Sequence, residues 1–342
     1  MRLYRRLLPI AALLALAVVG LGAWVRLSDA GLGCPDWPGC YGQWLGVPEH
    51  AADAARAWKE MIHRYLAGSL GLCILGLCLL AWRHRTRVSP VLPSLLCAIV
   101  VCQALLGMWT VTLLLKPLVV TAHLLGGMTT LALLVWLNLR QSAVTPGESV
   151  GPGLKVGGLL ALLLIVLQIG LGGWVSSNYA ALACPDFPTC HGNWLPATDF
   201  AGAFALHRGF DVVADGGLLP DAALATIHWS HRLGALLVAV TLGGLGISLL
   251  RRPGWAGAGG VLLGLLVAQA GLGIANVLFA RPLIPAVAHN LGAALLLAVV
   301  LWINHRFWRH SPGTLPEPAS FSPKTAPKAG KLSLQRPRPG RA

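Results

Sequence analysis

Charged residues are scarce in this chain. Asp, Glu, Lys and Arg together make up 11% of its 342 residues, whereas hydrophobic residues make up 56%. A soluble globular protein has no use for so much apolar surface, so the composition excludes that class. The apolar residues form repeated runs long enough to cross a hydrocarbon core of roughly 30 Å. Because every backbone N–H and C=O in lipid needs an internal partner, the fold class is predicted to be an all-α polytopic membrane protein.

Eight transmembrane helices are predicted from the lengths of the apolar runs. Their ranges are 7–27, 60–82, 91–114, 119–140, 155–176, 227–250, 256–279 and 285–305. The first run follows Arg-rich residues 1–6, as in a secretory signal, but it lacks a small-residue cleavage site before Trp24-Val25-Arg26. We therefore interpret it as a membrane helix.

Acidic residues are concentrated in two connecting segments, 28–59 and 177–226. Cations gather at the opposite ends of the spans, as Arg2, Arg5, Arg6, Arg83, Arg85, Arg87, Arg251 and Arg252. The positive-inside rule then predicts that both termini are cytoplasmic and both long loops outside, in a bacterial-type inner membrane. The net charge of +14 follows from this orientation and from the C-terminal tail, so no nucleic-acid partner is expected.

The chain is a tandem repeat. Residues 22–44 recur at 172–194, with Gly22, Trp24, Cys34, Cys40 and Trp44 matched by Gly172, Trp174, Cys184, Cys190 and Trp194. Further on, His63-Arg64 matches His231-Arg232, Gln103 matches Gln269, Lys116-Pro117 matches Arg281-Pro282, and His123 matches His289. Each repeat has four predicted spans, and an even number preserves orientation. The expected architecture is two tandem four-helix bundles related by a pseudo-twofold axis along the membrane normal.

Four parts follow from this division. The N-terminal bundle is expected at 1–140 and the C-terminal bundle at 155–310, joined by a Pro- and Gly-containing cytoplasmic linker at 141–154. Residues 311–342 contain one acidic residue, Glu317, and show no apolar period. They are predicted to be a disordered basic cytoplasmic tail that contacts anionic membrane lipid.

Four histidines lie inside the membrane at a common depth. His63, His123, His231 and His289 each fall within roughly two turns of the outer end of an even-numbered predicted span. Buried ionisable side chains are costly and tend to mark function, although single membrane histidines often only join helices by hydrogen bonds. Imidazoles from facing helices can fill both axial positions of a haem iron, whereas zinc prefers four clustered ligands. We predict two haem sites, one between His63 and His123 and one between His231 and His289.

Cations also occur near the outer ends, where the positive-inside rule does not favour them. They are Arg64, Arg232, Lys116 and Arg281. Haem propionates need cations at the water boundary, so these four are candidate propionate partners. The alternative is that they extend to the interface only to keep their own charge in water.

The two halves differ beside the histidines. Glu60 precedes His63 by three residues and shares its helix face, whereas the equivalent position in the second half is His228. This asymmetry indicates that one half binds a substrate and the other a permanent cofactor. Glu60 is the candidate catalytic residue, as a base or by stabilising positive charge. The alternatives are a helix N-terminal acid for Glu60 and a local hydrogen bond for His228.

Two pairs of cysteines lie in the predicted outer loops. Cys34 and Cys40 flank the sequence PDWPG, and Cys184 and Cys190 flank PDFPT. Turn-forming residues and an oxidising compartment favour one disulfide within each loop. A redox role for the first pair is a weaker alternative.

Taken together, these residues resemble the haem A synthase family. The resemblance covers residues 1–308 and rests on the CPDWPGC loop, EMIHR at 60–64, TAHLLGG around His123, IHWSHR at 227–232 and AHNLG around His289. It implies an enzyme that oxidises the C8 methyl group of haem O to a formyl group, through successive hydroxylations and loss of water, for terminal oxidases. It also implies that His231 and His289 ligate a haem b cofactor, that His63 and His123 flank the substrate haem O, and that Glu60 is catalytic.

The implied partners are haem O synthase, terminal oxidase assembly proteins and an electron acceptor. Two other functions fit part of the pattern. A di-haem b-type protein relaying electrons from quinol needs only the four histidines, but Glu60 on one side alone argues against a pure relay. A haem carrier needs weak ligation and no acid.

Overall fold

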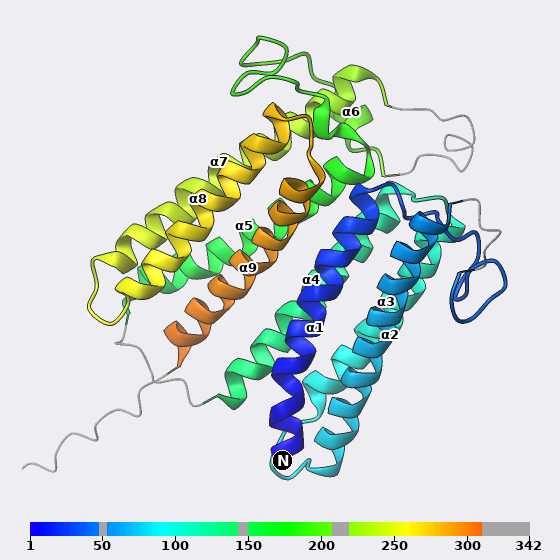
Figure 1. The fold of residues 1–342 in the computed structure, drawn as a ribbon. Coiled ribbons are helices and arrows are strands. Elements are labelled where there is room, and N and C mark those ends of the chain that lie inside the picture. The colour runs from blue at the N-terminus through cyan, green and yellow to red at the C-terminus, as the bar shows by residue number, and fades with distance from the viewer. Residues whose placement is uncertain (48–52, 143–149, 207–218, 310–342) are drawn as a thin grey trace, which may run out of the picture.

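The computed structural model describes residues 1–47, 53–142, 150–206 and 219–309 (Figure 1). Within these ranges the secondary structure is helical. The helices are α1 Arg2–Leu27, α2 Ala54–Arg83, α3 Val91–Thr112, α4 Pro117–Gln141, α5 Pro152–Ser177, η1 Ala180–Leu182, α6 Phe200–Ala203, α7 Asp221–Leu250, α8 Ala256–Leu278 and α9 Leu283–Trp308. The predicted tail at 311–342 and most of the predicted linker, 143–149, lie outside the described residues.

The fold class predicted from the sequence is confirmed. Among the described residues, eight helices, α1 to α5 and α7 to α9, are long and apolar enough to cross a membrane. Six of them begin earlier than predicted, and the difference is largest for α2, at Ala54 instead of 60, and α7, at Asp221 instead of 227. In α2 the Asp53 carboxylate accepts the backbone N–H of Arg56 and caps the first turn, whereas α7 starts after Pro220 without a side-chain cap and buries Ala223 and Leu224. Hydropathy alone does not detect a capped turn of the first kind.

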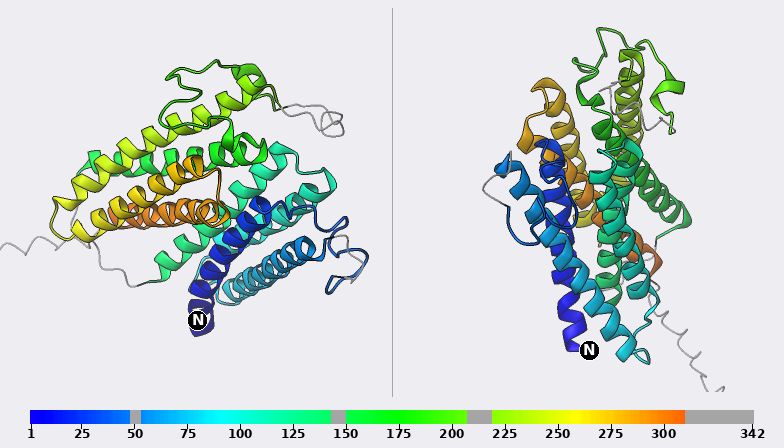
Figure 2. Two further views of the ribbon diagram at one scale, coloured as in Figure 1. Left: turned by 45° about the horizontal axis from the view of Figure 1, so that its top comes forward. Right: turned by 90° about the vertical axis from the view of Figure 1, so that its right-hand side faces the viewer.

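The spanning helices form two groups of four. In the first, α1 contacts α2 and α4, and α3 contacts α2 and α4; in the second, α5 contacts α7 and α9, and α8 contacts α7 and α9. The groups meet through α1, α4, α5 and α9, which leaves α2 and α3 on one side and α7 and α8 on the other (Figures 1 and 2). The pseudo-twofold axis and the domain boundaries stay predictions.

Equivalent amides join helices in the two groups. The Asn138 side chain donates to the backbone oxygen of Leu8 at 3.0 Å, which connects α4 to α1. Asn304 donates to the backbone oxygen of Gly158 at 2.9 Å, which connects α9 to α5. In lipid, packing apolar side chains against each other removes no water, so the hydrophobic effect does not hold helices together. Hydrogen bonds of this kind and close contacts do so instead.

The two long loops lie at one end of the molecule, and the N-terminus lies at the other (Figure 1). The first follows α1 and the second follows α5. The first turns of α2 and α7 therefore lie at the loop end of the molecule, which places the candidate site residues within reach of loop backbone groups.

Candidate functional site

Each predicted ligand histidine packs against a glycine of the preceding spanning helix. The pairs are Gly22 with His63, Gly107 with His123, Gly172 with His231, and Gly273 with His289. A Cβ atom at these glycines would lie 3.0, 3.3, 3.2 and 3.1 Å, respectively, from Cε1 of the ring. Such distances are too short for an unstrained contact. The absence of a side chain at each glycine therefore leaves the space that the imidazole occupies.

The histidines are brought together in the predicted pairs. His63 and His123 are close enough to interact electrostatically, and so are His231 and His289. Within the described ranges, no three His, Cys, Asp or Glu residues converge as a bare metal ion would require.

The two pairs differ in their hydrogen bonds. In the first half, the Nδ1 atoms of His63 and His123 are buried and have no hydrogen-bond partner among the described residues. In the second half, Nδ1 of His231 lies 3.0 Å from the amide nitrogen of Gln168, and Nδ1 of His289 lies 3.2 Å from a backbone oxygen of α8. Paired imidazoles, two of them with orphaned ring nitrogens, fit the axial ligand set of a haem iron.

Glu60 is enclosed by the first loop. Its side chain is only 6% exposed, and Oε2 accepts the backbone N–H of Cys34 at 3.0 Å. Oε1 pairs with the guanidinium of Arg64, one helical turn further along α2. Arg64 in turn donates to the backbone oxygens of Asp36, at 2.9 Å, and Gly39. The loop and α2 thus hold one carboxylate in a fixed position beside His63.

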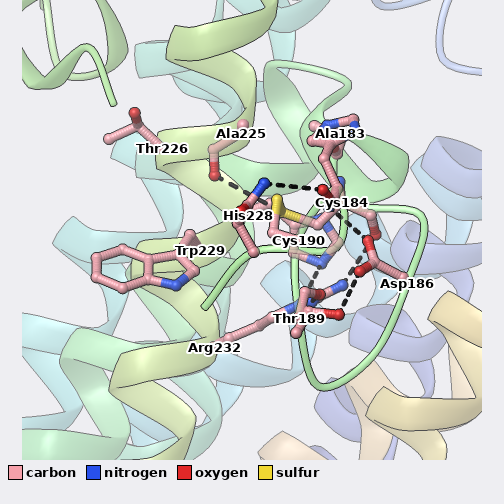
Figure 3. Close-up of a disulfide and its surroundings, with 12 residues drawn as sticks. Ala183, Cys184, Asp186, Thr189, Cys190, Ala225, Thr226, His228, Trp229 and Arg232 are labelled. Carbon is pink, nitrogen blue, oxygen red and sulfur yellow. Dashed lines mark hydrogen bonds between the residues drawn. A yellow bond between two sulfur atoms is a disulfide. The ribbon is translucent and has the colours of Figure 1, made fainter. Parts of the chain in front are cut away.

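The second half repeats this arrangement without the carboxylate (Figure 3). His228 replaces Glu60, with Nδ1 3.2 Å from the backbone nitrogen of Cys184 and Nε2 3.3 Å from Nε of Arg232. A neutral ring accepts at one nitrogen only, so one of these contacts is a hydrogen bond at a time. Arg232 also donates to the backbone oxygens of Thr189, at 2.7 Å, and Cys184, at 2.9 Å. His228 therefore contacts the loop backbone and Arg232, in agreement with the local hydrogen bond given above as its alternative role.

Both predicted disulfides are present. Cys34 is bonded to Cys40, and Cys184 to Cys190, with the paired Cα atoms 4.9 and 4.7 Å apart. Each bond closes the loop segment whose carbonyl groups receive an arginine from the helix below. The disulfides therefore support the contacts around Glu60 and His228.

An aspartate organises each closed loop. The Asp186 carboxylate accepts the hydroxyl of Thr189 and the backbone N–H groups of Gly192, at 2.9 Å, and His191, at 2.6 Å. These bonds, that of Thr189 first, lower the pKa of Asp186 to about 2 because they favour the charged form. Asp36 makes equivalent bonds to two backbone N–H groups in the first loop.

The four candidate propionate partners fall into two sets. The guanidinium groups of Arg64 and Arg232 bind loop carbonyl groups. Lys116 directly precedes α4, and Arg281 lies two residues before α9, so both lie at the loop end of a histidine-bearing helix. A propionate contact for any of the four stays a prediction.

Sequence patterns identify Gly22 and Gly172 as members of the repeat but not as partners of the histidines. They also miss the contact of Gln168 with His231, because the repeat places Val18, and not a glutamine, at the equivalent position of the first half. A search for residues facing each histidine from the preceding helix would have found both signals.

These features define an eight-span membrane protein with one pair of neighbouring histidines in each half. The chain belongs to the cytochrome oxidase assembly protein family (COX15-CtaA), whose model matches residues 5–301. The haem A synthase of Shewanella oneidensis is 43% identical over 328 residues, covering 90% of this chain and 98% of that protein.

More distant relatives carry the same name. The haem A synthase of Rhizorhabdus wittichii is 26% identical over 338 residues, covering 87% of this chain and 92% of that protein. The haem A synthase of a Methylobacterium species is 29% identical over 338 residues, covering 87% and 90%. The family resemblance inferred from the sequence motifs is confirmed.

Proposed function

We propose that this chain is a haem A synthase, which oxidises the C8 methyl group of haem O to a formyl group. The observation that carries this proposal is the asymmetry between two otherwise matched sites. Each half has a histidine pair under a disulfide-closed loop, but only the first half has a buried carboxylate, Glu60, beside that pair. A pure electron relay or a carrier has no use for this difference.

The halves take different roles in this proposal. His231 and His289 hold haem b as a permanent cofactor, and their Nδ1 atoms have partners that orient the rings. His63 and His123 flank the substrate haem O, which must be exchanged at every turnover. When bound, haem b supplies one-electron redox chemistry.

Glu60 acts on protons and charge in the first half. The backbone N–H of Cys34 and the guanidinium of Arg64 bind its carboxylate form and fix it on the helix face that carries His63. In that form it can accept a proton released as the methyl group is oxidised, or stabilise positive charge on the substrate. Arg64 and the loop act through Glu60 and exclude water from it.

The orientation in the membrane is also part of this proposal. We place the protein in a bacterial-type inner membrane, with both termini in the cytoplasm and both disulfide loops outside, on the distribution of arginine and on the loop disulfides. Haem O synthase as donor, terminal oxidase assembly proteins as acceptors of haem A, and a separate electron acceptor are the proposed partners.

Pigment extraction from the purified protein tests the function. The wild type is expected to yield haem A, or haem O and hydroxylated intermediates, together with haem b. Glu60→Ala is expected to retain haem but to form no haem A, whereas the matched variant His228→Ala keeps product formation. A single stable haem type in the wild type, or normal haem A from Glu60→Ala, contradicts the proposal.

A further inference from the structure

Three of the four histidines share a further motif, which involves glutamine. A glutamine lies four residues before the glycine that faces the ring, and a second glycine lies three residues after the histidine itself. The copies are Gln103 and Gly107 with His123 and Gly126, Gln168 and Gly172 with His231 and Gly234, and Gln269 and Gly273 with His289 and Gly292. We term this arrangement the glutamine module.

The second glycine of each module makes room for the glutamine. The amide groups of Gln103, Gln168 and Gln269 occupy the places that Cβ atoms would take at Gly126, Gly234 and Gly292, respectively. In two modules the amide NH2 also donates to the backbone oxygen of the histidine, at 2.9 Å for both His231 and His289. The side chain therefore needs both glycines, one for the imidazole and one for itself.

The Gln168 amide connects the ring of His231 to its own backbone. Its nitrogen lies 3.0 Å from Nδ1 and 2.9 Å from the backbone oxygen of His231. Its oxygen is buried without a partner among the described residues. As placed, this nitrogen can only donate, so it pairs with Nδ1 in the tautomer whose proton is on Nε2. In the tautomer that leaves Nε2 to bind iron, Nδ1 carries the proton, and the amide accepts it only when its oxygen is turned toward the ring.

The module is interrupted at His63. Gly22 still faces this ring, but Val18 occupies the place of Gln168, which differs from it by the repeat offset of 150. Leu66 occupies the place of Gly234, three residues after the histidine in both halves. Valine offers no hydrogen bond to the imidazole or to the backbone oxygen of His63. His63 thus differs from the other three ligands in two coordinated substitutions.

We propose that this interruption makes His63 the exchangeable ligand through which the first half admits and releases its haem, whereas Gln168 is a positioning residue that makes His231 a retaining ligand. The inference rests on the proposed function, in which only the first half handles a substrate. Partners of a ligating histidine typically change metal affinity by about 10–100-fold, which is enough to separate a retained group from an exchanged one. His123 keeps its module and remains the fixed ligand of the first half.

Haem transfer to apomyoglobin tests this inference without using catalysis. The full-length protein, loaded with iron protoporphyrin in detergent, is expected to lose haem in a fast and a slow phase, and His231→Ala assigns the slow one to the second half. Gln168→Val should speed the slow phase by about tenfold, and the double variant Val18→Gln/Leu66→Gly should slow the fast phase to a similar extent. Val18→Leu, which changes volume without adding an amide, should leave both phases unchanged.

The outcomes separate this inference from the proposed function. An unchanged slow phase in Gln168→Val overturns the positioning role, whether or not the double variant folds. An unchanged fast phase in a folded double variant overturns the exchange role of His63. Either result in a protein that still makes haem A leaves the proposed function standing, whereas a wild type that binds no haem removes both.

Discussion

Replacing Arg64 by methionine tests how the first loop holds its carboxylate. Arg64 and Glu60 have side chains that are 12% and 6% exposed, so the substitution leaves a nearly buried negative charge beside an apolar side chain. It also removes the hydrogen bonds from the guanidinium to the loop carbonyl groups. The second half provides the matched control, because Arg232→Met removes similar bonds to loop carbonyl groups but leaves only the neutral His228 behind.

The magnitudes separate the two variants. Removing one partner of a buried ion pair costs about 3–5 kcal/mol, because the remaining charge is uncompensated. The loss of hydrogen bonds from a charged donor to loop carbonyl groups, which Arg232→Met shares, costs about 1–3 kcal/mol. Converting the stranded Glu60 into a neutral amide in the double variant Arg64→Met/Glu60→Gln is expected to recover about 2 kcal/mol.

Equilibrium unfolding in mixed micelles with increasing SDS, followed by tryptophan fluorescence, measures these differences. Haem A output is measured in parallel, and Arg64→Met is expected to lose it along with the position of Glu60. Equal destabilisation by Arg64→Met and Arg232→Met, or no recovery in the double variant, would refute the reasoning. It would mean that the loop bonds alone set the energy and that the charge on Glu60 is compensated elsewhere.

Three further predictions concern the second half. His231→Ala should abolish the low-spin haem b spectrum of the purified protein, and an unchanged spectrum contradicts its role as a ligand. Gly172→Ala should weaken the same spectrum, because its Cβ would lie 3.2 Å from Cε1 of the ring, whereas Gly170→Ala, with its nearest contact at 3.8 Å, should not. Asp186 has an ordinary pKa of 3.8 and a folded pKa of about 2, so its charge stabilises the second loop above pH 3.8, and this contribution is lost as the pH falls through about 2. Reduction of the loop disulfide by a phosphine reagent should therefore accelerate between these pH values in the wild type and show no such step in Asp186→Asn.

Much of the fold was predictable because lipid imposes a simple rule on the backbone. Every apolar run of the required length became a helix, and the repeat fixed which runs correspond. The early start of α2 was missed because its first turn depends on the Asp53 cap and not on apolar residues. The loop disulfides followed from short spacing between cysteines and from the turn residues between them.

The sequence predicts candidate ligands but not the residues that support them. A histidine in an apolar run is conspicuous, whereas Gly22 contributes by having no side chain, and its partner lies on another helix. The arginines after the histidines were assigned to propionates on charge alone. The bonds of Arg64 to the loop backbone depend on how that loop closes over α2, which spacing in the sequence does not reveal.

The glycine contacts bear on how the protein is made. Each one joins two spanning helices that follow one another along the chain, so every imidazole receives its partner from the span synthesised just before it. A ribosome that has released α4 into the translocon has therefore already produced a complete pair of ligands. The other pair is finished only when α9, the last of the described spans, leaves the ribosome, so the glycine contacts of the first pair are complete while the second half is still being translated.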